Sequence, residues 1–511
     1  APTTASVSPT AGTSAPAALA TTTSAPPGKG KVLLMTRSLE PTSPFVGWMA
    51  SDNASGFVMV NIYDCLVRAT KDGQGVDPAL ATKWETSPDG KTWTFTLRDV
   101  KFSDNKPVTA ADVKASLDKA RLSDKSQWKN LFRAVTDVQA VDDQTVKILL
   151  SQPHPPLLAE LSQWSAQVMP ADMANAVEQQ GYDTYKTRGT GAYMLDGWKK
   201  GDPLILKKNP NYWKQPHNGP DEVHIDYVAD DNSRVLKLQG GETDVIDFVP
   251  YSQIATLNQG STKAQGFPIE TILTFNMNVT IKPLDDKKVR QALNYALDKE
   301  AIIKAVFFGY AKFMNSPLPP GTYYWDQTLK GYPYDLDKAK QLMAASSVPQ
   351  GFTYKQTVPA GDTVKLQVAT IAKDQWAKIG VTVDLQQLEP ATYSSQFKKG
   401  TSMAWFGTWT NDMSDPTEIA NANLRGGPPR FGAFSQYDSP QVDSLIDAAD
   451  TELDQKKREM LYQQVQQIFV DDAPQVFIAY PQATAAWQSY ISGFAIESLS
   501  FYRFEEVRVN K

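Results

Sequence analysis

Residues 78 to 113 read PALATKWETSPDGKTWTFTLRDVKFSDNKPVTAADV. Within this stretch Trp93 and Phe95 alternate with polar residues, which predicts a strand that is buried on one face. Thr109, followed three positions later by Asp112, resembles a capping box at the start of a helix, with Asp in the place of the usual Glu. The stretch therefore predicts half-buried strands followed by a helix.

Further strands and then helices follow along the chain. The runs LILKK near residue 204 and VHIDY near residue 223 predict strands. After residue 285 apolar residues recur every three to four positions, which is typical of helices. One such helix ends at Gly380 and leads directly into a strand, which makes an αβ unit. The predicted fold class is α/β, with β-like sequence returning at the C-terminus.

Size and composition exclude several classes of protein. A chain of 511 residues is long enough for about two to four domains, and 41% hydrophobic with 21% charged residues is typical of soluble globular proteins. The net charge of −5 provides no basic excess for a phosphate backbone, so we expect no nucleic-acid partner. No apolar run approaches the roughly 20 residues of a membrane span.

The first 30 residues differ in composition from the rest of the chain. They are rich in Ala, Thr, Ser and Pro and contain few apolar side chains, so they are expected to form a disordered tether. Such a tether is long enough to hold a folded domain clear of a surface. A disordered end without a role is the alternative.

Residues that commonly bind metals or phosphates are scarce. The chain has three His and one Cys without a common ligand spacing, and no GxxxxGK or GxGxxG loop, so we expect no metal and no cofactor. The single Cys65 permits no internal disulfide. Its apolar surroundings, NIYDCLV, predict a small buried side chain in a strand or a helix.

One enzymatic alternative arises from short motifs. S-x-x-K occurs at residues 116–119 and 126–129, and S-D-N at residues 103–105, as in penicillin-recognising serine hydrolases. The order of the motifs is reversed, however, and no K-T-G follows. The sequence favours a turn at residues 103–105 and a mid-helix position for Ser116, which leaves a serine hydrolase as a remote alternative.

The segment AWFGTWTNDMSDP, residues 404–416, combines aromatic and acidic residues. Aromatic clusters usually belong to a core, but polar residues follow Trp409 at once and a turn-forming Asp-Pro ends the segment. The pattern gives equal support to a core segment and to a segment that lines a surface cleft.

Several long motifs resemble one family, the extracellular solute-binding proteins of family 5, which include the oligopeptide and dipeptide receptors of ABC importers. The match covers nearly everything after residue 31. Besides the stretch quoted first, it includes GTGAY at 189–193, NPNYW at 209–213, GGETDV at 240–245, KKVRQALNYALDKEAI at 287–302 and YPYDLDKAKQLM at 332–343.

The resemblance implies a two-lobed, periplasmic-binding-protein-like fold of the Venus-flytrap type (type II, cluster C), with an extra subdomain in the first lobe. In the implied division into lobes, the first lobe consists of segments that are separated in the chain. Lobe I takes residues 31–58, 190–270 and 480–511, its extra subdomain takes 59–189, and lobe II takes 271–479.

The resemblance also implies ligand-binding residues. Peptide receptors of the family bind the α-ammonium group of the peptide with an Asp three positions after a Trp, and Trp409 with Asp412 reproduces that spacing. The alternative is that Asp412 only caps a turn. Dipeptide receptors place an Arg for the ligand carboxylate where this chain has Pro359, so that anchor is missing. The expected ligand-binding residues are Asp412, Trp409, Thr410, Trp405, Asn276, Phe45 and Trp48.

The implied function is that of a receptor without catalytic residues. Its two lobes would close on a peptide or peptide-like solute and deliver it to a membrane permease driven by an ATPase. A non-peptide solute such as an oligosaccharide, an opine or a metal chelate is the alternative. We expect a monomer outside the cytoplasm, in the periplasm or on the outer face of the cytoplasmic membrane, with membrane contact through a lipid anchor or the permease.

Overall fold

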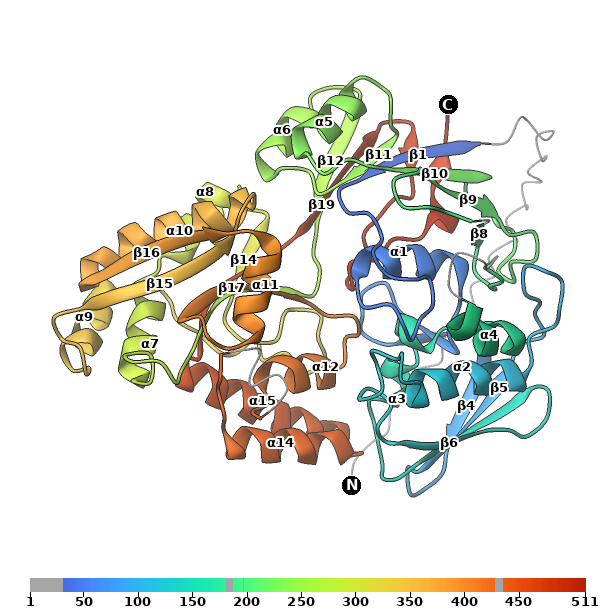
Figure 1. Cartoon of the computed structure of the whole chain (residues 1–511), viewed down its shortest axis with the longest axis horizontal. Helices are drawn as coiled ribbons and strands as arrows, with labels where there is room; N and C mark the ends of the chain where they lie inside the picture. Colours follow the sequence, from blue (N-terminus) through green and yellow to red (C-terminus); the bar gives the residue numbers. More distant parts are fainter. Residues whose placement is uncertain (1–30, 181–186, 196, 428–434) are drawn as a thin grey trace, which may run out of the picture.

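The structure, a computed structural model, describes residues 31–180, 187–195, 197–427 and 435–511. Three large sheets organise these residues into two lobes (Figure 1). Lobe I, on the right in Figure 1, contains a seven-stranded and a four-stranded sheet, and lobe II, on the left, contains a six-stranded sheet. This arrangement confirms the predicted two-lobed α/β fold. The predicted tether lies outside the described residues.

The stretch that starts at residue 78 folds as predicted. It supplies two strands of the four-stranded sheet, in which Phe95 is fully buried. The backbone N–H of Thr109 donates to the Asp112 carboxylate over 2.8 Å, so the capping box is present. The sheet has the order β4-β5-β7-β6 and the following bounds: β4 Ala81–Thr86, β5 Thr92–Leu97, β6 Val135–Ala140 and β7 Thr145–Leu150, with helices α2 Ala110–Leu122, α3 Leu157–Glu160 and α4 Ala171–Gln180.

The seven-stranded sheet is assembled from distant parts of the chain. Its order is β12-β19-β11-β1-β10-β9-β8, so the late strand β19 lies between β12 and β11. One face packs on α5 and α6, and the other shares one continuous apolar core with α1 and the four-stranded sheet. The bounds are β1 Val32–Arg37, β8 Tyr193–Leu195, β9 Leu204–Lys208, β10 Glu222–Tyr227, β11 Val245–Asp247, β12 Thr262–Phe267, β19 Ala483–Gln488, α1 Asn53–Ile62, α5 Asp231–Gln239 and α6 Ile254–Leu257.

The six-stranded sheet of lobe II is covered on both faces. Its central strand β13 is buried at every position: Phe275 faces the core formed with α7 to α10, and Ile272 faces the core formed with α14 and α15. The sheet order is β14-β18-β13-β17-β15-β16. The bounds are β13 Thr271–Met277, β14 Ala311–Phe313, β15 Phe352–Pro359, β16 Val381–Leu388, β17 Ala404–Thr410, β18 Gln475–Pro481, α7 Lys287–Tyr295, α8 Lys299–Val306, α9 Leu336–Ala344, α10 Thr363–Trp376, α11 Pro390–Lys398, α12 Thr417–Ile419, α14 Pro440–Thr451 and α15 Gln455–Asp472.

The predicted αβ unit is present in this lobe. Gly380 adopts a left-handed conformation with φ of 81° after the short helical turn that follows α10, and β16 begins at the next residue. A residue with a side chain is disfavoured in that conformation, which explains why Gly ends the helix.

Two short segments carry the chain between the lobes. Residues 268–270 connect β12 to β13, and Gln482 connects β18 to β19. Close to the second crossing, Tyr251 of lobe I packs against Phe307 of lobe II with ring centroids 5.3 Å apart. The lobes are therefore joined by two short connections and a packed aromatic contact.

Cys65 is buried as predicted, but it lies in neither a strand nor a helix. It follows α1 in the connection to β2 (Val67–Ala69), and its thiol donates to the carbonyl oxygen of Gln163 over 3.3 Å. Burial, with a smaller contribution from Asp64, raises the pKa of the thiol. The apolar character of NIYDCLV comes from a connection that packs into the core, so its secondary structure could not be inferred from hydrophobicity.

Candidate ligand-binding site

A cavity of about 790 Å³ lies between the two lobes. Lobe I lines it with residues around the start of α1 and between α2 and β6. Lobe II lines it with the end of β17, the loop that follows, the helical segment after that loop and Asp447 of α14. Its polar and aromatic lining includes Asn53, Gln127, Trp128 and Arg133 from lobe I, and Trp409, Thr410, Asp412, Glu418 and Arg425 from lobe II. The volume lies within the range of small-molecule sites.

The aromatic-acidic segment divides between core and cavity. The first four residues of β17 are buried in the sheet, whereas its last residues are partly exposed, and Trp409 and Thr410 line the cavity. Asp412 follows in the loop and lines it as well. The strand therefore projects its last residues beyond the core and into the space between the lobes.

Two further carboxylates fix the loop that carries Asp412. Asp415 forms a bidentate pair with Arg458 of α15, with N–O distances of 2.6 and 2.8 Å, and both side chains are almost fully buried. Glu418 accepts hydrogen bonds from the backbone N–H groups of Asp412 at 2.9 Å and Met413 at 3.0 Å. The loop is thus held from both sides at the edge of the cavity.

The part of the lining formed by Asp412 and Glu418 is acidic. Burial raises the pKa of the Glu418 carboxyl well above its ordinary value, and the neighbouring Asp412 raises it further. Two carboxyl groups in one partly desolvated site resist ionising together, and a cationic group placed between them relieves that repulsion. This part of the lining is therefore suited to a ligand ammonium group.

Asp412 also faces lobe I. It lines a second, small cavity of about 20 Å³ together with Gln163, Trp164 and Arg503. Gln163 and Trp164 are almost fully buried, and their side-chain nitrogens Nε2 and Nε1 have no hydrogen-bond partner among the described residues. The space is sufficient for about one water molecule. Unused donors thus lie on the lobe I wall opposite the acidic loop.

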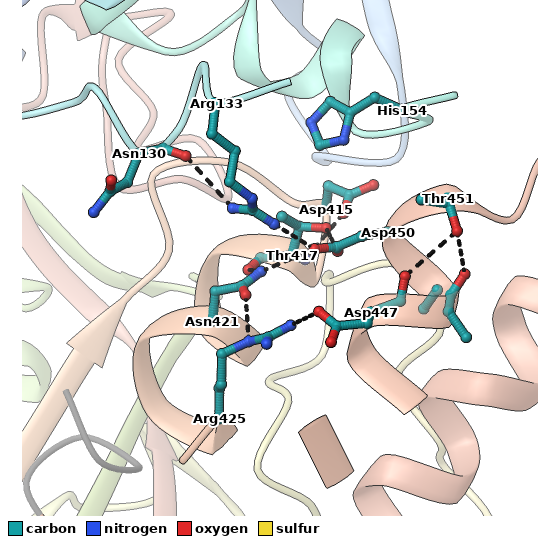
Figure 2. Close-up of polar contacts among 12 residues, drawn as sticks. Asn130, Arg133, His154, Asp415, Thr417, Asn421, Arg425, Asp447, Asp450 and Thr451 are labelled. Carbon is teal, nitrogen blue, oxygen red and sulfur yellow. Dashed lines mark hydrogen bonds and ion pairs between the residues drawn. The ribbon is translucent and has the colours of Figure 1, made fainter. Parts of the chain in front are cut away.

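Two arginines line the cavity at the contact between the lobes (Figure 2). Arg133 of lobe I pairs with Asp450 of α14 over 2.5 Å, and its side chain remains 46% exposed. Arg425 pairs with Asp447 of α14 and donates from Nε to Asn421 over 2.8 Å. Unlike Arg458, whose fork is fully used by Asp415, both arginines retain partial access to solvent.

Sequence reasoning missed Arg133, Arg425 and Glu418. Glu418 continues the acidic spacing of Asp412 and Asp415, so the sequence contained a signal for it. Nothing in the sequence near Arg133 connects it with residues roughly 300 positions away; only the contact between the lobes does so.

Four of the predicted site residues do not line the cavity. Trp405 stacks on Phe397 with centroids 4.4 Å apart, and Asn276 is its neighbour in the adjacent strand. Phe45 and Trp48 are fully buried in the core of lobe I, where the indole nitrogen of Trp48 donates to Glu178 over 2.9 Å. A role of these four in binding remains a prediction, made from the aromatic-acidic segment for Trp405 and from position for the other three.

The serine-hydrolase motifs have structural explanations. Ser116 is buried within α2 and donates to the carbonyl oxygen of Met169 over 3.2 Å, while Lys119 binds Glu178. Ser126 donates to Ala120, and Lys129 pairs with Asp124. Neither serine is hydrogen-bonded to the lysine of its motif.

In the described part of the chain, no cluster of three or more His, Cys, Asp or Glu side chains is arranged to bind a metal ion. Within the same residues, no helix is long and apolar enough to span a membrane.

Two α/β lobes joined by two crossings, with a solute-sized cavity between them, define a bilobal binding protein. Residues 75–429 match the profile of the bacterial extracellular solute-binding proteins, family 5, and the chain belongs to that family. It is therefore an extracytoplasmic solute-binding protein of the ABC-transporter type and not an enzyme.

Three similar proteins have different ligands in their names or structures. The probable D,D-dipeptide-binding periplasmic protein DdpA of Escherichia coli K12 is 31% identical over 88% of both chains. The periplasmic binding protein DppA of Helicobacter pylori, solved with the peptide STSA, is 28% identical with a TM-score of 0.81, covering 94% of this chain and 98% of that chain. The binding protein AgaA of A. tumefaciens R10, solved with agropinic acid, is 25% identical with a TM-score of 0.80, covering 94% and 99%.

Proposed function

We propose that this protein captures a small peptide with free termini and delivers it to a membrane permease that an ATPase drives. The observation that carries the proposal is the charge of one cavity lining, which includes the acidic Asp412 and Glu418 and the basic Arg133 and Arg425. A lining with both signs of charge matches a zwitterion, because each end of the ligand then has a charged partner.

Aromatic side chains support the same ligand class. Trp409 of lobe II and Trp128 of lobe I line the cavity, and Trp128 is fixed by donating to the carbonyl oxygen of Ala50 over 2.7 Å. Such walls accept varied apolar side chains and attract an ammonium group through the ring face. The similarity to proteins that are named as dipeptide-binding or were solved with a peptide also supports the proposal.

The proposed closure uses the division expected from the sequence. We take residues 31–58, 190–270 and 480–511 as lobe I, 59–189 as its extra subdomain and 271–479 as lobe II, acting as one monomer. The solute would contact lobe II first through Asp412 and Trp409, and closure would bring lobe I over it. A lipid anchor on the tether remains a prediction, since residues 1 to 30 lie outside the described residues.

A ligand screen tests the proposal. Native mass spectrometry of the purified protein is expected to show a bound mass within the range of di- to pentapeptides. Thermal shift with such peptides is expected to raise the melting temperature, since a ligand at 100 times its dissociation constant adds about 2.7 kcal/mol of stability. Peptides that leave the protein unchanged, together with a response to the opine agropinic acid or an oligosaccharide, would establish the alternative class. The similarity to AgaA makes an opine the first alternative to include.

A second prediction, with a smaller expected effect on affinity, concerns Arg133 of lobe I. Wild-type protein is expected to bind trialanine about tenfold more tightly than trialanine amide, because a charged hydrogen bond contributes about 1.5–3 kcal/mol and Arg133 is partly solvated. Arg133→Gln should abolish that preference in isothermal titration calorimetry. Arg121→Gln, which removes a guanidinium paired with Asp118 on α2, should keep it. An undiminished preference in the Arg133 variant would exclude this anchor.

A further inference from the structure

Glu270 is a buried carboxyl group in one of the two crossings between the lobes. Its side chain is fully buried, although it belongs to the short connection between β12 of lobe I and β13 of lobe II. A carboxyl group is rarely placed in such a position without a charged partner, because burial penalises its ionised form.

The carboxyl group binds the loop that carries Asp412. Its oxygen Oε1 accepts from Ser414 Oγ at 2.5 Å, and Oε2 accepts from Asn411 Nδ2 at 2.9 Å and Thr322 Oγ1 at 3.0 Å. The backbone of Asn411 also donates to the carbonyl oxygen of Glu270 over 2.9 Å. Glu270 thus holds residues on both sides of Asp412, which lines the ligand cavity.

On its other side Glu270 is covered by the extra subdomain of lobe I. The tip of the hairpin formed by β2 and β3 (Val76–Pro78) places Gly73 so close that a Cβ there would lie 2.6 Å from Oε1. Gln74 of the same tip donates to the carbonyl oxygen of Gly321 in lobe II over 2.5 Å. Because this subdomain shares one core with lobe I, opening of the lobes would lift the tip and admit water to the carboxyl group.

Among the described residues, the groups that face Glu270 provide no compensating cation. Burial raises its pKa from 4.5 to about 7, although the three hydrogen bonds oppose that rise. Lys71 of the hairpin pairs with Glu506, and Arg503 of the C-terminal segment lies 3.7 Å from Glu497. The remaining titratable groups nearby are Asp72 from the hairpin, Tyr323 from the adjacent loop, and Asp412, Asp415 and Glu418 from the ligand-binding loop.

We propose that Glu270 is a positioning residue for Asp412 and that its protonation couples lobe packing, and with it ligand affinity, to pH. The coupling to affinity rests on the proposed role of Asp412. With the tip in place the carboxyl group is neutral at low pH and closure is favoured. With the tip lifted it is hydrated and ionises readily, so rising pH favours the open form.

The pH range in which Glu270 affects lobe packing follows from the pKa of its carboxyl group in the packed and in the hydrated state. The hydrated carboxyl has the ordinary pKa of 4.5 and the packed one a pKa of about 7. Packing is therefore most favourable below pH 4.5, weakens between pH 4.5 and 7, and is constant above that range. Closure within this pH range is accompanied by proton uptake at Glu270, whereas a ligand cation that favours ionised Asp412 and Glu418 promotes proton release from those two groups.

Hydrogen exchange tests the proposal without a ligand. Protection of backbone amides in residues 408–418, corrected for intrinsic rates, is expected to be on the order of tenfold greater at pH 5.0 than at pH 7.5. Glu270→Gln keeps the shape of the side chain but cannot ionise, so its protection should depend on pH much less than that of wild type. Glu300→Gln, an exposed carboxyl on α8, should behave as wild type. A wild-type protein without pH dependence, or an unchanged dependence in Glu270→Gln, would refute the proposal.

A second measurement separates the coupling from a purely structural role. Calorimetry of trialanine binding at pH 6 in two buffers with different ionisation enthalpies should reveal proton uptake by Glu270 as the lobes close, so the net number of protons taken up should be greater in wild type than in Glu270→Gln. An equal net number in both would show that Glu270 does not couple protonation to binding. If trialanine fails to bind while the exchange result holds, the peptide proposal fails and the positioning role stands. If trialanine binds through Asp412 while the exchange result is absent, the peptide proposal stands and the positioning role of Glu270 fails.

Discussion

Replacing Asp412 by asparagine is expected to weaken binding of a peptide with a free amino terminus by about 30- to 5,000-fold, which corresponds to about 2–5 kcal/mol. The reason is that the ligand ammonium would remain desolvated between the lobes with Glu418 as the nearby carboxyl, whose pKa is raised by burial. Calorimetric titration of the best peptide from the screen measures the change.

Two controls make this result specific. Asp374→Asn changes an exposed carboxylate on α10 away from the cavity, and its affinity should equal that of wild type. The same peptide with an acetylated amino terminus should bind wild type weakly and lose little further affinity in the Asp412 variant. Equal losses for free and acetylated peptides would show that Asp412 shapes the loop and does not bind the ammonium group.

Replacing Arg458 by methionine is expected to lower the free energy of unfolding of lobe II by about 3–5 kcal/mol, because Asp415 would remain buried without its cation. Burial alone raises the pKa of Asp415, but the Arg458 guanidinium outweighs burial and holds the pKa below its ordinary value. The stabilisation is therefore present above the ordinary pKa of an Asp and is lost as pH falls through the folded pKa. Urea denaturation at pH 7 and at acidic pH measures both effects.

The double variant Arg458→Met with Asp415→Asn distinguishes loss of the pair from loss of packing. It should recover part of the stability lost in Arg458→Met, because no charge is then left uncompensated. Lys129→Met, which removes one partner of the surface pair with Asp124, should leave the midpoint unchanged. A double variant as unstable as the sum of its single changes would indicate that packing of Arg458 against its neighbours is the main contribution.

The elements of the fold could be predicted because each has its own local signal. Alternation predicted β5, the 3.6-residue period predicted α10, and Gly380 marked the end of that helix. The period does not distinguish one helix from two, and the apolar run after residue 287 divides into α7 and α8 at Asp298, whose side chain caps the second helix.

The site could be predicted only where its residues lie close together in sequence. Trp409, Thr410 and Asp412 form one segment, and the resemblance to peptide receptors, carried by the spacing of Trp and Asp, predicted them; all three line the cavity. Arg133 and Glu270 lie in other parts of the chain, and each becomes relevant only when the lobes pack together. Phe45 and Trp48 were chosen by position, whereas the nearby residues Ser51 and Asn53 line the cavity.

The place of β19 in the seven-stranded sheet has a consequence for biosynthesis. This strand, near the end of the chain, separates β12 from β11, whereas all strands of the six-stranded sheet lie between residues 271 and 481. Strand β18, which lies between β14 and β13 in the six-stranded sheet, comes directly before β19 in the chain, so during synthesis neither sheet can complete its hydrogen-bonded ladder until about the last forty residues have emerged. The facing edges of β12 and β11 stay unpaired until then, and such edges can pair with other chains.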